Sequence, residues 1–518
     1  MSSHRSNPTR KSVYAAVAIA SVGAIAVAVS HAASKPKSDS QPLIEKWVGP
    51  GKGAVLPAMA SYPNAAGTLG VVNEKGAIDT KGHPFFEPLG ENGRACVTCH
   101  QPSDAMSLSL DTIRERWEAT KGKDPLFDTF DGANCPDKPR GKRESHSLLL
   151  DHGLIRIGMP WPPKDANGNP IEPEFTLEVV RDPTGCNTSP KYGLNSSNPT
   201  VSVYRRPRMA ANLRYVTTSF SLSGRFNGKT GEPLAVHPKN GQRVGLPIMA
   251  DARNPTLEAQ AADAARNHMR VHAKLTDEQI DKMVEFESQV YVAQDWHKIA
   301  GSLIEKGAPP ALGPMALVRG ESILPGNNWQ NPVFMSFDAW KEAPGETEEQ
   351  RKFRESVARG YDIFFLRPMW IRDVAWFSSI GMGNPYKRTC AICHSVHLTG
   401  NNISPGLMDL GVNNVDLGID MPDLPVFKVT CRKDALPHPY LGHEFLTYDP
   451  GRALVTGKCI DVGSLVMQQM RGMSARAPFF SNGSAKTIRE VVDYYDTRFE
   501  MQMTEQEKED LTNFMSVL

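Results

Sequence analysis

The sequence predicts a mainly α-helical protein made of two similar modules in tandem, with few and short strands. The first observation is a duplicated CxxCH motif, which starts at Cys96 and again at Cys390, each with an arginine two residues earlier. The second is a repeated helix start with an apolar face behind it. The third is the scarcity of segments that alternate apolar and polar residues, the pattern of half-buried strands.

The repeated helix start is a capping box in each half of the chain. Thr276 with Gln279, and Thr504 with Glu507, supply the two side chains that satisfy each other's backbone N–H groups at a helix N-terminus. Apolar residues then recur at helical spacing on one face: Ile280, Met283, Phe286 and Val290 in the first half, and Leu511, Phe514, Met515 and Leu518 in the second. We predict that each helix closes one module.

A length of 518 residues suits two or three domains rather than one. Proline and glycine punctuate residues 307–331, and a charged helical run at residues 346–365 leads into the second CxxCH motif. The predicted organisation is a signal peptide at 1–33, an N-terminal module with insertions at 34–300, a linker at 301–345 and a C-terminal module at 346–518.

The N-terminal segment is typical of an export signal. Arg5, Arg10 and Lys11 precede an uncharged, mostly apolar run at residues 13–29, and small residues stand at Ser30 and Ala32. We expect cleavage and a periplasmic location, with retention as a membrane anchor as the alternative. No later stretch of the sequence is long and apolar enough to span a membrane.

The eight cysteines divide into four in the CxxCH motifs and four outside them. An oxidising compartment permits disulfides among the latter, and proximity along the chain favours Cys135 with Cys186 and Cys431 with Cys459. Three pairings of four cysteines are formally open, and buried free thiols are the alternative.

A CxxCH motif binds haem covalently, because its two thiols form thioethers with the porphyrin and the adjacent histidine ligates the iron. The sequence therefore predicts two haem c groups in two cytochrome c-like domains. A zinc site or a redox dithiol is the alternative, which the export signal and the duplication disfavour. The predicted attachment residues and proximal ligands are Cys96, Cys99 and His100, and Cys390, Cys393 and His394.

The sequence is less decisive about the opposite face of each haem. Met106 and His397 lie too close to the proximal histidines along the chain to reach across the ring. The formal charge of +1 predicts no broad electrostatic attraction to nucleic acid.

Both motifs, their tandem order and the run Ala-Pro-Phe-Phe-Ser-Asn-Gly-Ser at 477–484 resemble the bacterial di-haem cytochrome c peroxidase superfamily. That group includes the di-haem enzyme that matures methylamine dehydrogenase and, more distantly, rubber-cleaving di-haem oxygenases. The resemblance runs from about residue 82 to residue 518 and is strongest from residue 449 onward.

The resemblance implies that the His100 haem reacts with peroxide or dioxygen, while the His394 haem relays electrons. The implied electron donor is a periplasmic protein such as a small cytochrome c or a cupredoxin. The resemblance also implies a calcium ion between the domains, with ligands that the sequence does not identify, and it leaves a homodimer open.

Two positions depart from the pattern of the peroxidases. Tyr495 stands where the resemblance places a methionine ligand, and a tyrosine there is similar to the methylamine-dehydrogenase-maturing enzyme, which implies ligation by phenolate. A packed helix aromatic is the alternative role. The rival ligands are Met467, Met470, Met473 and His443.

The second departure concerns the N-terminal haem. Neither residues 222–225 nor residues 249–253 supply the tryptophan that the resemblance leads one to expect between the haems, and His268 lies in the neighbourhood of the expected catalytic glutamate. His268 is the predicted acid–base residue; its alternatives are an iron ligand and an exposed histidine without a role. The expected function is a peroxidase-like oxidoreductase, the alternatives being an oxidase or oxygenase of an organic or protein substrate and a non-catalytic electron carrier.

Overall fold

A computed structural model describes residues 46–165, 167–217, 248–319, 337–342, 345–375, 383–394 and 407–518. Residues 45–518 form one compact unit. With 31% helix and 20% strand distributed over many small sheets, the fold is mixed α and β, so the predicted mainly α class is wrong. The helices of the described residues are α1 (Leu110–Thr120), α2 (Ser147–His152), α3 (Leu213–Thr217), α4 (Leu257–His268), α5 (Asp277–Gln289), α6 (Pro314–Val318), α7 (Glu348–Leu366), α9 (Ala453–Thr456), α10 (Ile488–Phe499) and α11 (Glu505–Ser516).

The strands pair in six sheets of two to four strands within the described part of the chain. The largest has the order β2-β3-β8-β9, and a three-stranded sheet has the order β14-β13-β6. The strands are β1 (Val55–Leu56), β2 (Met59–Asn64), β3 (Gly67–Asn73), β4 (Ile78–Asp79), β5 (Ile155–Pro160), β6 (Phe175–Arg181), β7 (Thr200–Arg205), β8 (Val290–His297), β9 (Gly301–Ser302), β10 (Met369–Ile371), β11 (Tyr386–Arg388), β12 (Leu407–Met408), β13 (Val426–Cys431), β14 (Glu444–Thr447) and β15 (Leu465–Val466).

The search for alternating apolar and polar residues missed several strands because these strands are buried on both faces. In β8 every residue from Val290 to Gln294 is buried, and β7 is buried from Val201 to Arg205. Strands of this kind read as continuous runs, which periodicity cannot distinguish from buried helix. Val290 illustrates the error. The sequence pattern places it on the apolar face of a helix, but α5 ends at Gln289 and the backbone of Val290 is extended, with ψ of 124°.

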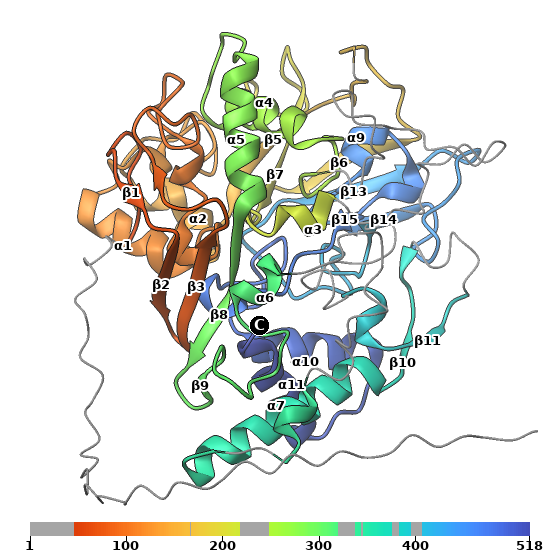
Figure 1. The fold of residues 1–518 in the computed structure, drawn as a ribbon. Helices are drawn as coiled ribbons and strands as arrows, with labels where there is room; N and C mark the ends of the chain where they lie inside the picture. The colour runs from red at the N-terminus through yellow and green to blue at the C-terminus, as the bar shows by residue number, and fades with distance from the viewer. Residues whose placement is uncertain are drawn as a thin grey trace, which may run out of the picture. The chain divides into compact units, whose positions relative to one another are not determined.

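One sheet joins the two halves of the sequence. Strand β6 of the first half pairs with β13 of the second, in a register that sets Leu177 opposite Val429 (Figure 1). The predicted linker falls partly outside the described residues, so the predicted domain limits stay a prediction. The sheet hydrogen-bonds residues 175–181 to residues 426–431.

Helices α7, α10 and α11 lie side by side and form the largest apolar cluster of the second half (Figure 1). Phe364 of α7 and Phe514 of α11 pack with ring centroids 5.5 Å apart. The predicted capping boxes are confirmed at the starts of α5 and α11, where Thr276 and Thr504 accept from the backbone N–H groups of Gln279 and Glu507. The predicted helical run at 346–365 is confirmed as α7.

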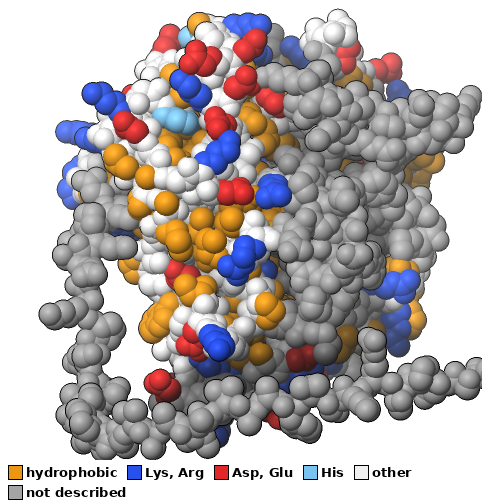
Figure 2. Space-filling view, viewed as in Figure 1, with side chains coloured by type: hydrophobic (Ala, Val, Ile, Leu, Met, Phe, Trp, Pro, Cys, Tyr) orange, Lys and Arg blue, Asp and Glu red, His pale blue; other side chains and the backbone are white. Residues whose placement is uncertain are grey.

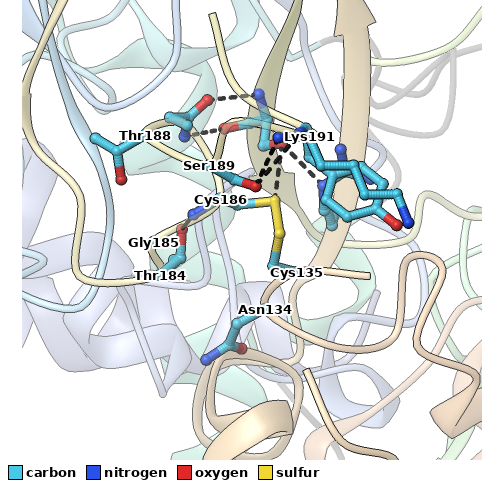
Figure 3. The surroundings of a disulfide bond; sticks show 12 residues. Asn134, Cys135, Thr184, Gly185, Cys186, Thr188, Ser189 and Lys191 are labelled. Carbon is cyan, nitrogen blue, oxygen red and sulfur yellow. Dashed lines mark hydrogen bonds between the residues drawn. A yellow bond between two sulfur atoms is a disulfide. The ribbon is translucent and has the colours of Figure 1, made fainter. Parts of the chain in front are cut away.

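The two predicted disulfides, Cys135–Cys186 and Cys431–Cys459, are confirmed. Figure 3 shows Cys186 in a tight loop, where its N–H donates to the hydroxyl of Thr184 at 3.2 Å and its carbonyl accepts from the N–H of Ser189 at 3.3 Å. Because the Cys135–Cys186 bond joins residues 51 apart, loop-closure entropy predicts a stabilisation of about 4 kcal/mol.

On the part of the face in Figure 2 that is coloured by side-chain type, basic and acidic side chains are interspersed among hydrophobic ones. Within the described ranges, no helix is both long and apolar enough to cross a membrane. The predicted signal peptide at 1–33 lies outside the described residues.

The close crossing of α7 and α11 generates a stability prediction. A Cβ at Gly360 would lie 2.0 Å from the carbonyl oxygen of Asp510 and 2.7 Å from the Cβ of Phe514. Gly360→Ala gains up to ~1 kcal/mol in helix propensity, but the overpacking costs about 1–3 kcal/mol, so we expect a net fall in the free energy of unfolding measured by urea titration. Lys352→Ala on the exposed face of α7 is the control, with a change within about 0.5 kcal/mol; a more stable Gly360→Ala protein would contradict the crossing.

Candidate functional site

The two CxxCH motifs fold in the same way. Each begins with a single 3₁₀ turn, at Cys96–Thr98 and at Cys390–Ile392, after an extended residue. In both turns the N–H of the histidine donates to the carbonyl of the first cysteine at 3.1 Å. This turn holds the two thiols and the adjacent imidazole of each motif against one cavity.

The first motif lies in a cavity of about 170 Å³, which is room for on the order of ten water molecules. Cys96, Cys99 and His100 line it, with apolar side chains such as Ile155 and Met283. The second motif lines another cavity of about 170 Å³. This second cavity is rich in thioethers from Met369, Met408, Met467, Met470, Met473, Met501, Met503 and Met515.

The backbone carbonyl of Met106 orients the His100 imidazole. It lies 3.0 Å from Nδ1 of His100, and because a carbonyl only accepts, Nδ1 carries the proton and Nε2 keeps its lone pair. Ala105 and Met106 both adopt positive φ, near 57° and 54°, which turns this carbonyl toward the ring. Burial lowers the pKa of His100, so the ring is neutral, as an iron ligand must be.

The cysteines of the motifs are thiols of low reactivity. Burial raises the pKa of Cys99 to about 11 and that of Cys390 to about 12, and it also raises the pKa values of Cys96 and Cys393. A redox dithiol needs the opposite, an exposed cysteine with a lowered pKa. The raised pKa values therefore disfavour a redox dithiol at either motif.

His268, the last residue of α4, lines the first cavity. Its Nδ1 lies 2.7 Å from Asp131, and the other oxygen of Asp131 pairs with the buried guanidinium of Arg94, two residues before Cys96. Burial alone would raise the pKa of Asp131, but the Arg94 charge and the His268 hydrogen bond outweigh it, so the pKa lies below its ordinary value. The ionised carboxylate fixes the orientation of the His268 ring through Nδ1. The other ring nitrogen, Nε2, is then the atom that can bind a metal or exchange a proton.

Tyr495 of α10 lines the second cavity, with its ring stacked on Phe499 at a centroid distance of 6.0 Å. Burial raises its pKa, so the side chain is a phenol unless a cation stabilises the phenolate. Among the rival ligands, Met467, Met470 and Met473 line the same cavity, whereas His443 is exposed and does not line it. Ligation by Tyr495 stays a prediction, as does the catalytic role of His268.

Three arginines beside the cavities, Arg206 and Arg476 buried and Arg208 half-buried, were missed by the sequence interpretation. Arg206 and Arg208 line the first cavity and Arg476 lines the second. In the described part of the chain they make no ion pair: Arg208 donates to the carbonyls of Val466 and Met467, and Nε of Arg476 has no partner. Burial lowers the pKa of Arg206 and Arg208 to about 10 and that of Arg476 to about 9, the last also through repulsion by the other two.

Uncompensated buried cations call for anions, because an unpaired ion in a protein interior costs several kcal/mol. The propionates of a haem are carboxylates, and guanidinium groups pair with carboxylates through charge-assisted hydrogen bonds. Together with the thiols and the oriented imidazole in the same cavities, Arg206, Arg208 and Arg476 make the residues present fit haem. The sequence around these arginines contains no motif that indicates a role in binding the carboxylates of a cofactor.

Glu287 is a fourth residue that the sequence interpretation missed. It lines the first cavity from α5, is 4% exposed, and its Oε2 has no hydrogen-bond partner. Burial raises the pKa of Glu287 to about 8, so the carboxyl holds a proton at neutral pH. Its position four residues after Met283, on the apolar stripe of α5, is the signal that could have identified it.

The two cavities adjoin. Val466, Gln468 and Gln469 line both, so this short segment forms a shared wall. Met249 and Arg253, from the segment without the expected tryptophan, line the first cavity. Residues 222–225 and His397 lie outside the described residues. Among those that are described, no group of three or more His, Cys, Asp or Glu side chains could hold a metal ion, and the implied calcium stays a prediction.

Comparison with known proteins does not identify a family for this chain. No protein-family model matches the chain, and no curated protein matches it. Among solved structures, a hydrazine synthase from Kuenenia stuttgartiensis, pressurised with xenon, aligns over 79% of this chain and 93% of its own, with 11% identity and a TM-score of 0.29. A likeness this loose supports no inference about fold or function.

The buried ion pair at the first cavity generates a stability prediction. Asp131→Asn leaves the Arg94 guanidinium buried without a counter-charge, so we expect the free energy of unfolding to fall by about 3–5 kcal/mol. Because the folded pKa of Asp131 is depressed, the wild-type contribution is present above about pH 4 and is lost as the pH falls through the folded value.

The control for this measurement is Asp151→Asn, which breaks the exposed pair with Arg143. The free energy of unfolding of this variant, measured by denaturant titration, should differ from that of the wild type by no more than about 1 kcal/mol. Equal small losses in both variants would show that the buried pair adds nothing to stability.

Proposed function

We propose that this chain is an exported di-haem c-type cytochrome of peroxidase-like activity, which takes electrons through the C-terminal haem and reduces peroxide at the N-terminal haem. The observation that carries the proposal is that each CxxCH motif lines its own apolar cavity and that Val466, Gln468 and Gln469 line both. Two adjoining sites with one separating wall suit the passage of electrons from one to the other.

Haem attached at these motifs would supply an iron that reduces peroxide in the first cavity and an iron that exchanges electrons in the second. The protein's part at the first cavity is to move protons. His268, held by Asp131 through Nδ1, presents Nε2 for transfer between the two peroxide oxygens. Glu287 holds a second proton in the same cavity, because burial raises its pKa to about 8.

The second cavity is suited to electron storage. Its eight methionines and Tyr495 provide soft or aromatic neighbours and exclude water from the site. Arg476 lines this cavity as a buried cation, which favours the reduced, more negative state of a redox centre. The donor we propose is a small periplasmic cytochrome c or cupredoxin, and the two disulfides support an oxidising compartment.

A non-catalytic electron carrier is the second candidate, and one observation favours it. A histidine whose Nδ1 is held by a carboxylate has the geometry of a metal-ligating histidine with its outer partner. If Nε2 of His268 binds iron, the first site is closed to peroxide and both haems only pass electrons.

Peroxide turnover with a reduced small cytochrome c tests the proposal. The holo protein should contain two haems by pyridine haemochrome absorbance and show a high-spin ferric population. His268→Gln should retain both haems and lower peroxide turnover by about 10²–10⁴-fold, because it removes the acid–base group.

His272→Gln is the matched control, since His272 is an exposed histidine four residues further along, and its turnover should not change. Two low-spin ferric sites that do not respond to peroxide would contradict the peroxidase. A high-spin signal that emerges only in His268→Gln would establish the carrier, with His268 as ligand.

A further inference from the structure

A cluster of three titratable side chains, of which Asp409 and His438 are buried and Tyr440 is half-buried, lies against the second cavity and has no part in the function proposed above. Asp409 lines the cavity and is 3% exposed. The Tyr440 hydroxyl donates to Oδ2 of Asp409 at 2.6 Å, and Nε2 of His438 lies 3.0 Å from the same oxygen. The other oxygen accepts the N–H of Gly411 at 2.9 Å.

The protonation of His438 follows from its second ring nitrogen. The backbone N–H of Leu441 donates to Nδ1 at 3.3 Å, so Nδ1 accepts and Nε2 carries the proton that faces Asp409. Asp409 thus accepts from three donors, and among the described residues it has no lysine or arginine as an ion-pair partner.

Two ionisable side chains of α10 face the cluster, and the buried cation Arg476 lines the same cavity. These groups of α10 are Arg498 and Tyr494. Nε of Arg498 and the hydroxyl of Tyr494 donate to the carbonyl of Leu410 at 3.0 Å and 3.2 Å, and Arg498 also donates to the carbonyl of Asp373 at 2.8 Å. Burial raises the pKa of Asp409, but the hydrogen bonds from His438 and Tyr440 outweigh that effect, so the pKa lies below its ordinary value.

We propose that the Asp409–His438 pair is a proton-binding site that takes up one proton when the haem at the second motif takes up one electron, with Tyr440 as a positioning residue. The inference rests on the proposed haem at His394. An added electron places negative charge beside a buried carboxylate that has no cationic partner, and the low-dielectric interior screens the repulsion poorly. A proton on the pair removes the repulsion.

The balance is one electron from the donor and one proton from solvent, so the net charge of the second site does not change. By linkage, protonation of the pair raises the reduction potential by the same free energy with which reduction raises its proton affinity. The proposed peroxidase reaction consumes one proton for each electron, and this site takes up the two together.

Spectroelectrochemical titration of the holo protein from about pH 4 to pH 9, a range that brackets carboxyl and imidazole groups, tests the inference. In the wild type, the midpoint reduction potential of one haem should fall by about 59 mV per pH unit over part of this pH range, called the window below, as expected for one proton per electron. Asp409→Asn should abolish the slope and raise that midpoint at alkaline pH, because the negative charge is absent.

Tyr440→Phe removes one donor to the carboxylate, which raises its proton affinity and should move the window to higher pH. Tyr448→Phe is the matched control: Tyr448 also donates to a carboxylate, Asp420, at 3.1 Å, but neither residue lines the cavity, so the profile should not change. If Asp409→Asn does not fold, Tyr440→Phe and His438→Gln decide, and an unshifted window in both would overturn the inference.

Failure of this inference is distinguishable from failure of the proposed function. Bound haem with a midpoint independent of pH would overturn the proton site alone. A holo preparation with a proton-coupled midpoint but no peroxide turnover would support the proton site and contradict the peroxidase, while protein without haem absorbance would contradict both.

Discussion

The segment Val466–Gln469 is held in place by hydrogen bonds from the first half of the chain, and both cavities depend on that placement. The N–H of Val466 donates to the carbonyl of Ala250 at 2.8 Å, and Arg208 donates to the carbonyls of Val466 and Met467. Gln469 reaches the carbonyl of Ala211 at 2.9 Å. Without these bonds one wall of each cavity would be lost, so the two sites form as a pair.

Desolvation explains the electrostatics around that wall. Where a buried charge has a partner inside the protein, as Arg94 has Asp131, the pair is neutral and fixes a third group, His268. Where a buried arginine has no acidic partner, as at Arg206 and Arg476, burial lowers its pKa, and Nε of Arg476 is left without a hydrogen-bond partner. Two of the buried side chains with a polar atom that lacks a partner, Glu287 and Arg476, line the cavities.

The local sequence signals were reliable where a few adjacent residues decide the outcome. The capping boxes at Thr276 and Thr504 formed as expected, and the disulfides joined the cysteines nearest along the chain. The mainly α prediction failed because β8 is buried on both faces and therefore lacks the alternation that marks a strand. Glu287 was overlooked since an acidic residue on a helix usually faces solvent.

The sequence by itself determined the chemistry that can be attached: the CxxCH spacing brings two thiols and an imidazole together within one turn, whatever the remainder of the chain does. Only the tertiary structure decided what faces those groups. Asp131 and His268 are 137 residues apart, and Asp409 and His438 are 29 apart, yet each pair shares a hydrogen bond beside a cavity. Such contacts depend on how distant segments pack, and neither periodicity nor motif spacing contains that information.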